Sequence, residues 1–175
     1  MSHDPHASAH AHRRAAPRAL SVVVVTVSDT RTLADDTGGA LLAELLEGAG
    51  HRVVERSIVR DEIDAIRAAV GAAVQRDGVH VVLLTGGTGI AARDVTPEAV
   101  DPLLDRRIPG FGELFRALSY QQIGSAAILS RAFAGTARGR VVVALPGSRA
   151  AIRLALEKLL LPELPHLESE AAKGA

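Results

Sequence analysis

The apolar residues of this chain follow two spacings, one typical of buried strands and the other of amphipathic helices. Short runs of Val, Ile and Leu, continuous or at every second position, predict strands at residues 21–27, 52–59, 79–84 and 141–145. Apolar residues three or four positions apart predict helices at residues 38–48, directly after residue 61, and at residues 149–160. Because strands and helices alternate, we expect an α/β fold, a three-layer sandwich with a mostly parallel sheet and helices on both faces.

The third predicted strand leads directly into a glycine-rich loop, Thr85, Gly86, Gly87, Thr88 and Gly89. Glycine exposes backbone N–H groups and adopts positive φ without strain, so such a loop after a strand can hold an anion, most often a phosphate. A tight strand-to-helix connection without a ligand is the plainer interpretation. Ile-Ala-Ala-Arg follows the loop, and it supplies neither the lysine of a P-loop nor the third glycine of the dinucleotide motif.

Polar residues also follow the other predicted strands. In a parallel sheet the loops after the strands meet at one edge, so we expect these residues to lie together with the glycine loop. They are Ser28 and Asp29 after the first strand, Asp61 after the second, Asp94 beyond the glycine loop, and Pro146, Gly147 and Ser148 after the last strand.

Each of these polar residues also has a plain structural explanation. Asp61 and Ser148 could be helix N-caps, Asp94 a turn residue, and Asp29 an acceptor for backbone donors in its own loop. Their predicted convergence favours chemistry instead, because carboxylates beside a phosphate repel it unless a divalent cation lies between them. Aspartates near a glycine loop that lacks lysine therefore predict Mg²⁺-dependent chemistry on a phosphorylated ligand.

Length and composition limit the classes of protein that need to be considered. The chain has 175 residues, and we predict one domain at residues 19–167, preceded by a disordered His- and Ala-rich tail at 1–18 and followed by a flexible tail at 168–175. Twenty basic and 20 acidic residues give no net charge, which argues against binding nucleic acid through a basic surface. The sequence has no cysteine and no apolar stretch near the roughly 20 residues of a membrane span. We expect a cytoplasmic protein that binds neither nucleic acid nor a membrane.

Several longer motifs occur in order along the chain, namely TVSDTRT, DDTGG, TGGTGIAARDVTPEAV, IPGFGELFRALSYQQIGSAAILSRAFAG and LPGSRAA. Through them the chain resembles the molybdenum-cofactor biosynthesis proteins of the MoaB/Mog type, with their molybdopterin-binding fold, over about residues 19–167. The DDTGG motif and the middle segment are more similar to the MoaB branch than to the Mog branch.

The resemblance implies that the chain binds molybdopterin and transfers AMP from ATP to its terminal phosphate, with release of pyrophosphate. Asp61 and Asp94 match the two catalytic carboxylates that the family associates with magnesium. The resemblance also implies a homotrimer or homohexamer. The residues that it places around the substrate are Ser28, Asp29, Thr85 to Gly89, Glu113, Ser130 and Pro146 to Ser148.

Two other functions compete with this hypothesis. A molybdopterin-binding carrier or scaffold without catalysis would bind the pterin but release no pyrophosphate, and a generic nucleotide-binding domain would bind ATP regardless of the pterin. The two intact aspartates favour an enzyme over the carrier, and the missing phosphate motifs disfavour the generic domain. We interpret Phe111, Phe115 and Leu118 as core or subunit interface, and His51 and His80 as structural.

Overall fold

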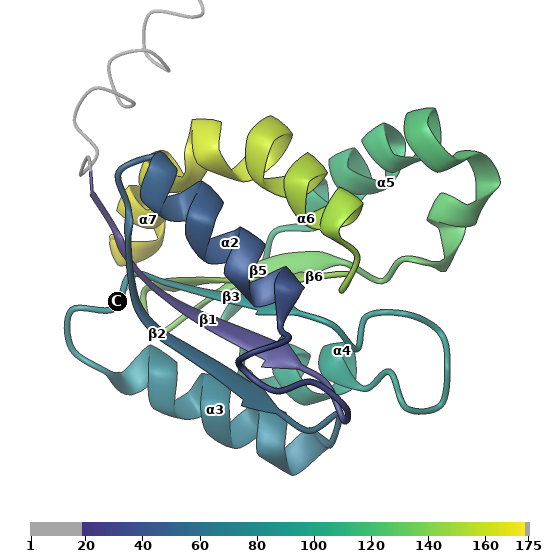
Figure 1. Ribbon diagram of the computed structural model, residues 1–175. Helices are drawn as coiled ribbons and strands as arrows, with labels where there is room; N and C mark the ends of the chain where they lie inside the picture. Colours follow the sequence, from purple (N-terminus) through teal and green to yellow (C-terminus); the bar gives the residue numbers. More distant parts are fainter. Residues whose placement is uncertain (1–18, 174–175) are drawn as a thin grey trace, which may run out of the picture.

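A six-stranded sheet forms the middle layer of the molecule, and the computed structural model describes residues 19–173 (Figure 1). The strand order is β2-β1-β3-β6-β5-β4, and the first four strands in this order are parallel. Those four are β2 (Arg52–Val59), β1 (Ser21–Val27), β3 (Val81–Thr85) and β6 (Arg140–Leu145). The predicted α/β fold with a mostly parallel sheet is confirmed. The predicted N-terminal tail lies outside the described residues.

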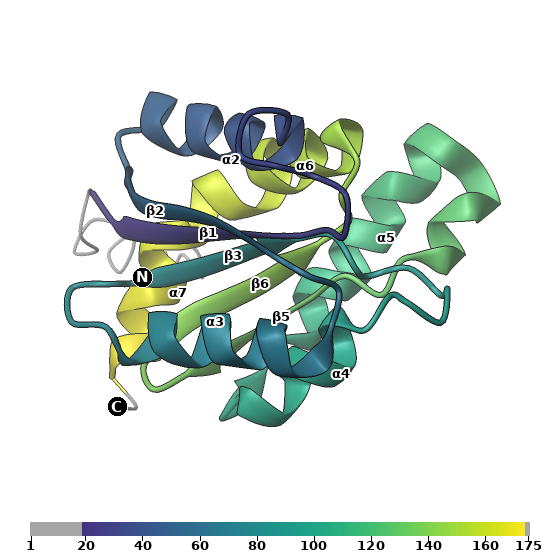
Figure 2. The ribbon, with the colours of Figure 1, turned by 60° about the horizontal axis from the view of Figure 1, so that its bottom comes forward.

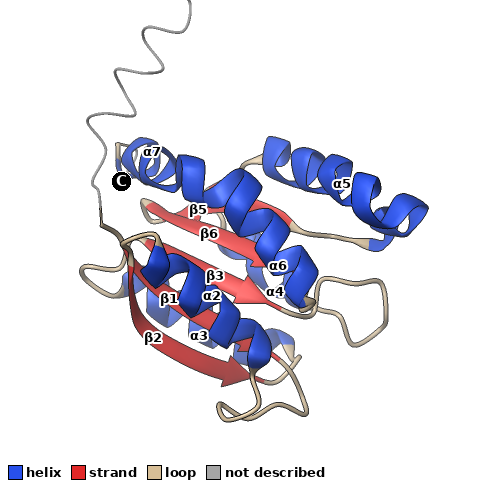
Figure 3. Ribbon diagram, turned by 45° about the horizontal axis from the view of Figure 1, so that its top comes forward, coloured by secondary structure: helices blue, strands red, loops and turns tan. Residues whose placement is uncertain are grey.

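Helices cover both faces of the sheet (Figures 2 and 3). One layer contains α3 (Ile63–Gln75) and α4 (Thr96–Val100), which is followed by the short turn η1 (Asp101–Leu103). The opposite layer contains α2 (Thr37–Gly48), α5 (Pro109–Ile123), η2 (Gly124–Leu129), α6 (Arg149–Ala155), the π-helical turn η3 (Leu156–Leu160) and α7 (Leu161–Ala172).

The two-sided cover explains the continuous apolar runs in the sequence. Alternate residues of β1 enter different cores, Val22 and Val24 on the α2 face and Val23 and Val25 on the α3 face. A strand buried on both faces has no polar positions to alternate with. Phe111 and Phe115 stack with ring centroids 6.2 Å apart, and both are buried in the core on the α2 face.

Two strands at one side of the sheet were not predicted. β5 (Phe133–Ala137) runs antiparallel to β6, and β4 (Arg106–Arg107) runs antiparallel to β5. Arg138 and Gly139, both with positive φ, form the tight turn between β5 and β6. The sequence of β5, FAGTA, consists mostly of small residues and so lacks the apolar pattern that marks the other strands.

The C-terminal region also differs from its prediction. Residues 168–172 were predicted as part of a flexible tail but belong to α7, where Leu164, Glu168 and Ala171 are buried. Pro165 inside this helix interrupts the helical pattern in the sequence, although burial of one face holds the helix together. No helix within residues 19–173 is both long and apolar enough to cross a membrane.

Candidate functional site

The loops that follow the parallel strands meet at one edge of the sheet, as their topology requires. Figure 1 shows the loops after β1, β2 and β3 on the same side of the molecule. The loop after β6 joins them, because Gly86 N–H donates to Leu145 O (3.0 Å) and the Thr85 hydroxyl donates to Pro146 O (3.1 Å). Thr85 is thereby buried and ties two loops together.

The glycine loop is tightly enclosed by its neighbours. Gly86 and Gly87 have φ of +107° and +63°. A Cβ on Gly86 would lie 2.2 Å from Val27 O, and one on Gly87 would lie 2.3 Å from the Thr96 hydroxyl oxygen. Both positions therefore need glycine for their backbone conformation and for space.

Asp61 does not cap α3, and that prediction is wrong. The N-cap position of α3 belongs to Glu62, which makes no side-chain capping bond. Asp61 Oδ1 instead accepts a hydrogen bond from Val95 N–H (3.2 Å), in the loop between β3 and α4. Its carboxylate also lies against the glycine loop, since a Cβ on Gly87 would be 2.8 Å from Asp61 Oδ1.

The charge on Asp61 has unfavourable surroundings. Partial burial raises the pKa of Asp61 above its ordinary value, and the nearby charges of Asp94 and Asp29 raise it further. Asp29 Oδ1 accepts a hydrogen bond from Asp61 N–H (3.2 Å), so the backbone donor that it serves lies in the loop after β2 and not in its own loop. The guanidinium of Arg93 donates to the other Asp29 oxygen and holds the pKa of that carboxyl below its ordinary value.

Asp94 closes the turn after the glycine loop. Its Oδ2 accepts a hydrogen bond from Ala91 N–H (2.8 Å), which agrees with the turn explanation. Within residues 19–173, no hydrogen bond uses the second oxygen of either carboxylate, Asp61 Oδ2 or Asp94 Oδ1. Two such oxygens suit Mg²⁺, a hard cation that binds one or two carboxylates and completes its shell with water and substrate phosphate. No cluster of three His, Asp or Glu side chains suited to a metal exists in the described part of the chain.

Arg131 holds the glycine loop from the opposite side, and sequence reasoning missed it. Its Nε donates to Gly89 O (2.7 Å), its Nη2 donates to Asp94 O, and its backbone N–H donates to Thr88 O (2.9 Å). Its Nη1 pairs with Glu98, which holds the pKa of that carboxyl below its ordinary value. The contact joins residues about 40 positions apart, and the only sequence signal was that Arg131 directly follows Ser130.

Most of the residues predicted to bind substrate border one of three cavities, whereas Thr85, Gly86, Gly87 and Gly147 border none of the three. Thr88, Gly89, Ser130, Pro146 and Ser148 line one of about 220 Å³ beside the glycine loop. Ser130 also borders a cavity of about 580 Å³, whose lining includes Glu113 but neither Asp61 nor Asp94. Ser148 accepts from Ala151 N–H (3.2 Å), so it is also the N-cap of α6.

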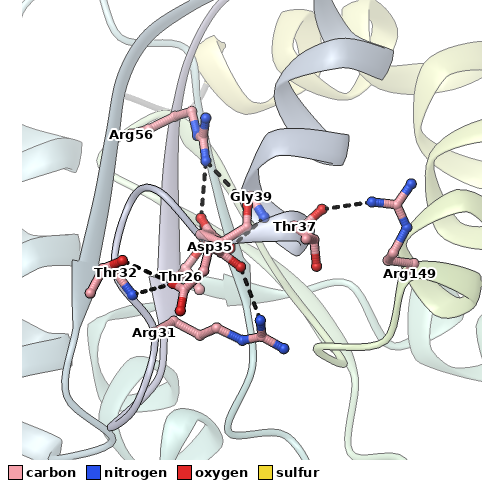
Figure 4. Close-up of polar contacts among 9 residues, drawn as sticks. Thr26, Arg31, Thr32, Asp35, Thr37, Gly39, Arg56 and Arg149 are labelled. Carbon is pink, nitrogen blue, oxygen red and sulfur yellow. Dashed lines mark hydrogen bonds and ion pairs between the residues drawn. The ribbon is translucent and has the colours of Figure 1, made fainter.

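The third cavity, of about 560 Å³, lies over the ends of β1 and β2 and is bordered by Ser28 and Asp29. Behind it, the buried Asp36 caps α2 and accepts from Gly39 N–H (2.8 Å) and from the Thr26 hydroxyl (2.8 Å). Arg56 reaches from β2 to pair with the same carboxylate (3.1 Å), in the group of contacts drawn in Figure 4. This network fixes the loop between β1 and α2.

The fold and its loops define an α/β domain with a glycine loop and two carboxylates at one sheet edge. Residues 23–166 match the family model described as "probable molybdopterin binding domain". The chain belongs to the MoaB/Mog family of molybdenum cofactor biosynthesis proteins, as its motifs led us to expect.

Close relatives and solved structures agree with this assignment. The chain is 52% identical over 160 residues to molybdenum cofactor biosynthesis protein B of Bacillus cereus, covering 91% of this chain and 95% of the relative. A crystal structure of a molybdenum cofactor biosynthesis protein B is 52% identical and superposes with a TM-score of 0.87, covering 90% of this chain and 99% of that one. The tungsten cofactor synthesizing protein MoaB of Pyrococcus furiosus is 39% identical, with a TM-score of 0.80 and coverage of 90% and 99%.

Proposed function

We propose that this protein binds molybdopterin and transfers AMP from ATP to its terminal phosphate, acting as a molybdopterin adenylyltransferase in the cytoplasm. The observation that carries the proposal is the pair formed by Asp61 and Asp94. Asp61 lies just before α3 but does not cap it, and its carboxylate instead accepts from Val95 beside the glycine loop. Burial and the neighbouring carboxylates raise its pKa there. A perturbed carboxylate in such a position is typical of a functional site.

The reaction needs positioning and charge stabilisation more than proton transfer. An oxygen of the pterin phosphate attacks the α-phosphorus of ATP. The new P–O bond forms as the bond to the α,β-bridging oxygen breaks, and that oxygen leaves with the electron pair as part of pyrophosphate. The attacking phosphate is already ionised at neutral pH, so no protein base has to remove a proton.

The cavity of about 220 Å³ beside the glycine loop has a polar end and an apolar end. Thr88, Gly89 and Ser148 border it together with apolar side chains of α5 and η2, and we assign it to molybdopterin with the terminal phosphate at the glycine loop. Mg²⁺ held by Asp61 and Asp94 would supply positive charge that offsets the repulsion between the two anionic substrates. The free oxygens of both carboxylates support this assignment.

We also propose that the protein is a homo-oligomer, a trimer or a hexamer. Several large apolar side chains are exposed on the hairpin of α5 and η2, namely Leu114, Tyr120, Ile123, Ile128 and Leu129. A concentration of exposed apolar side chains on one projection favours a protein contact.

The test is pyrophosphate release from ATP, measured with molybdopterin and the purified protein, with and without Mg²⁺. We expect Mg²⁺-dependent release that falls at least about 100-fold in Asp94→Asn, because the amide removes the charge and keeps the shape. Asp77→Asn is the control, since Asp77 is exposed before β3 at the opposite edge of the sheet.

Two results would contradict the proposal. Unchanged release in Asp94→Asn would refute the metal role of the aspartates. Molybdopterin binding by the wild-type protein without pyrophosphate release would replace the transferase with the carrier.

A further inference from the structure

The cavity over the ends of β1 and β2 has a conspicuous lining, which we name the arginine hollow. Three guanidinium groups border it, Arg31, Arg56 and Arg60, together with the hydroxyls of Ser28 and Thr32. Its volume is about 560 Å³. Nothing in the proposed chemistry described so far uses these arginines.

The three arginines of the hollow differ in whether they have a charged partner. Arg56 is committed to the buried Asp36. Arg31 donates to the backbone carbonyl of Asp35 (2.9 Å), as Figure 4 shows. Its charge also lies near the Asp35 carboxylate, which accepts its hydrogen bonds from Thr32 and forms no ion pair with Arg31.

Arg60 is the most exposed of the three, with 72% of its side chain accessible, and it has a long contact to Glu62 (3.5 Å). The carboxylate of Asp29 also borders the hollow, but Arg93 pairs with it. Arg31 and Arg60 are therefore available to an anionic ligand.

The hollow lies over the ends of β1 and β2 next to Asp61, whereas the cavity assigned to the pterin is bordered by the loops after β3 and β6. Asp29, at its border, accepts from Asp61 N–H, while the Asp61 carboxylate contacts the glycine loop. Phosphoryl transfer places the attacking and leaving oxygens roughly in line on opposite sides of the phosphorus. If the pterin phosphate attacks from the glycine loop, the leaving diphosphate points toward β2.

Three other arginines of the described residues lie in loops or helix ends at this side of the sheet, Arg93, Arg131 and Arg149, but none of them borders the hollow. The two lysines of the sequence, Lys158 and Lys173, lie in η3 and after α7, away from the loops that follow the parallel strands.

We propose that the arginine hollow binds the β- and γ-phosphates of the nucleoside triphosphate and then the pyrophosphate released from it. This inference rests on the proposed function. Arg31 and Arg60 would contact the phosphates, and Arg56 would hold the wall of the hollow through Asp36. Because the hollow recognises phosphates rather than a base, it would also bind free pyrophosphate.

The experiment is calorimetric titration of the purified protein with inorganic pyrophosphate in the presence of Mg²⁺. We expect wild-type protein to bind, Arg31→Gln and Arg60→Gln each to bind several-fold more weakly, and the double variant at least about tenfold more weakly. Arg60→Lys should recover part of the loss, since it keeps the charge. Arg52→Gln, at the opposite end of β2, should bind like wild type.

Wild-type protein that does not bind pyrophosphate, or a double variant that binds as tightly as wild type, would overturn the inference. Thermal unfolding of each variant separates loss of binding from loss of structure. Arg60 serves best because its side chain is exposed and Glu62 is its one ion-pair partner within the described residues. If the arginines prove necessary for pyrophosphate binding but the wild-type protein does not transfer AMP, the hollow stands and the transferase proposal fails.

Discussion

The loops before the parallel strands and the loops after them both contain glycines with positive φ, but the surroundings of these glycines differ. The loops before the strands form the amino edge of the sheet, and the loops after them form the carboxyl edge. Gly50 and Gly78, before β2 and β3, have φ of +86° and +75°, and a Cβ on either would meet no atom within 4 Å. Gly86 and Gly87, after β3, have similar φ but no space at all for a Cβ. A turn glycine at the amino edge provides only a conformation, whereas at the carboxyl edge it also lets three loops pack against one another.

The polar groups of the two edges differ in the same way. At the amino edge, His51 Nδ1 accepts from Leu20 N–H (3.3 Å), directly before β1, and His80 Nδ1 accepts from Ser21 N–H (3.0 Å), the first amide of β1. At the carboxyl edge, the charges of Asp29 and Asp94 lie close enough to Asp61 to raise its pKa. The histidines of the amino edge therefore satisfy backbone donors and stabilise the fold. The carboxylates of the carboxyl edge repel one another, and a bound ligand would relieve that repulsion.

The largest test of this comparison replaces one glycine at each edge. Gly86→Ala should lower the free energy of unfolding by about 3 kcal/mol or more, because positive φ and a contact with Val27 O both oppose a Cβ. Gly78→Ala, which meets only the conformational penalty, should cost about 1 kcal/mol. Urea unfolding of both variants measures the difference. Equal costs would show that packing at the carboxyl edge is looser than the structure indicates.

The contrast also marks how far the sequence could predict the structure. β1, β3 and β6 were predictable because burial on both faces requires a continuous apolar run. The meeting of their loops at one edge followed from parallel topology alone. β5 could not be predicted, since its small residues pair by backbone hydrogen bonds and leave no periodic pattern.

Within the site, tertiary contacts decided what local rules could not. An aspartate before a helix is a reasonable N-cap, yet Asp61 bonds to Val95, 34 residues away. Arg131 donates to three carbonyls of the loop between β3 and α4, those of Thr88, Gly89 and Asp94, and pairs with Glu98 in α4. No spacing in the sequence indicates these contacts. Side-chain partners of this kind depend on how the loops pack.

The next test lowers the pH and follows His51 at the amino edge. Burial lowers the pKa of His51, so below about pH 6.5 the unfolded chain takes up a proton that the folded protein does not. The free energy of unfolding should therefore fall as the pH decreases from 6.5 toward the lowered pKa, by up to about 1 kcal/mol from this residue. His51→Gln should be less stable at pH 7.5 but lose less on going to pH 5.5, as measured by urea unfolding. A variant with the full acid sensitivity of wild type would assign the effect to other groups.

The smallest change in the free energy of unfolding is expected for a substitution at the carboxyl edge, and this change is an increase. Asp61→Asn keeps the oxygen that accepts from Val95 N–H but removes a charge whose pKa is raised in the folded protein. An acid with a raised pKa destabilises the fold at neutral pH and ceases to do so once it is protonated. The variant should therefore be more stable than wild type at pH 7 by a few tenths of a kcal/mol, after allowance for solvent screening, and the gain should disappear near pH 4. Differential scanning calorimetry at the two pH values measures it, alongside pyrophosphate release, which we expect to be lost. If Asp61→Asn stabilises the protein and abolishes transfer, Asp61 is retained for its ligand. If the variant is instead less stable than wild type at pH 7, the Asp61 charge already has a favourable partner within the protein.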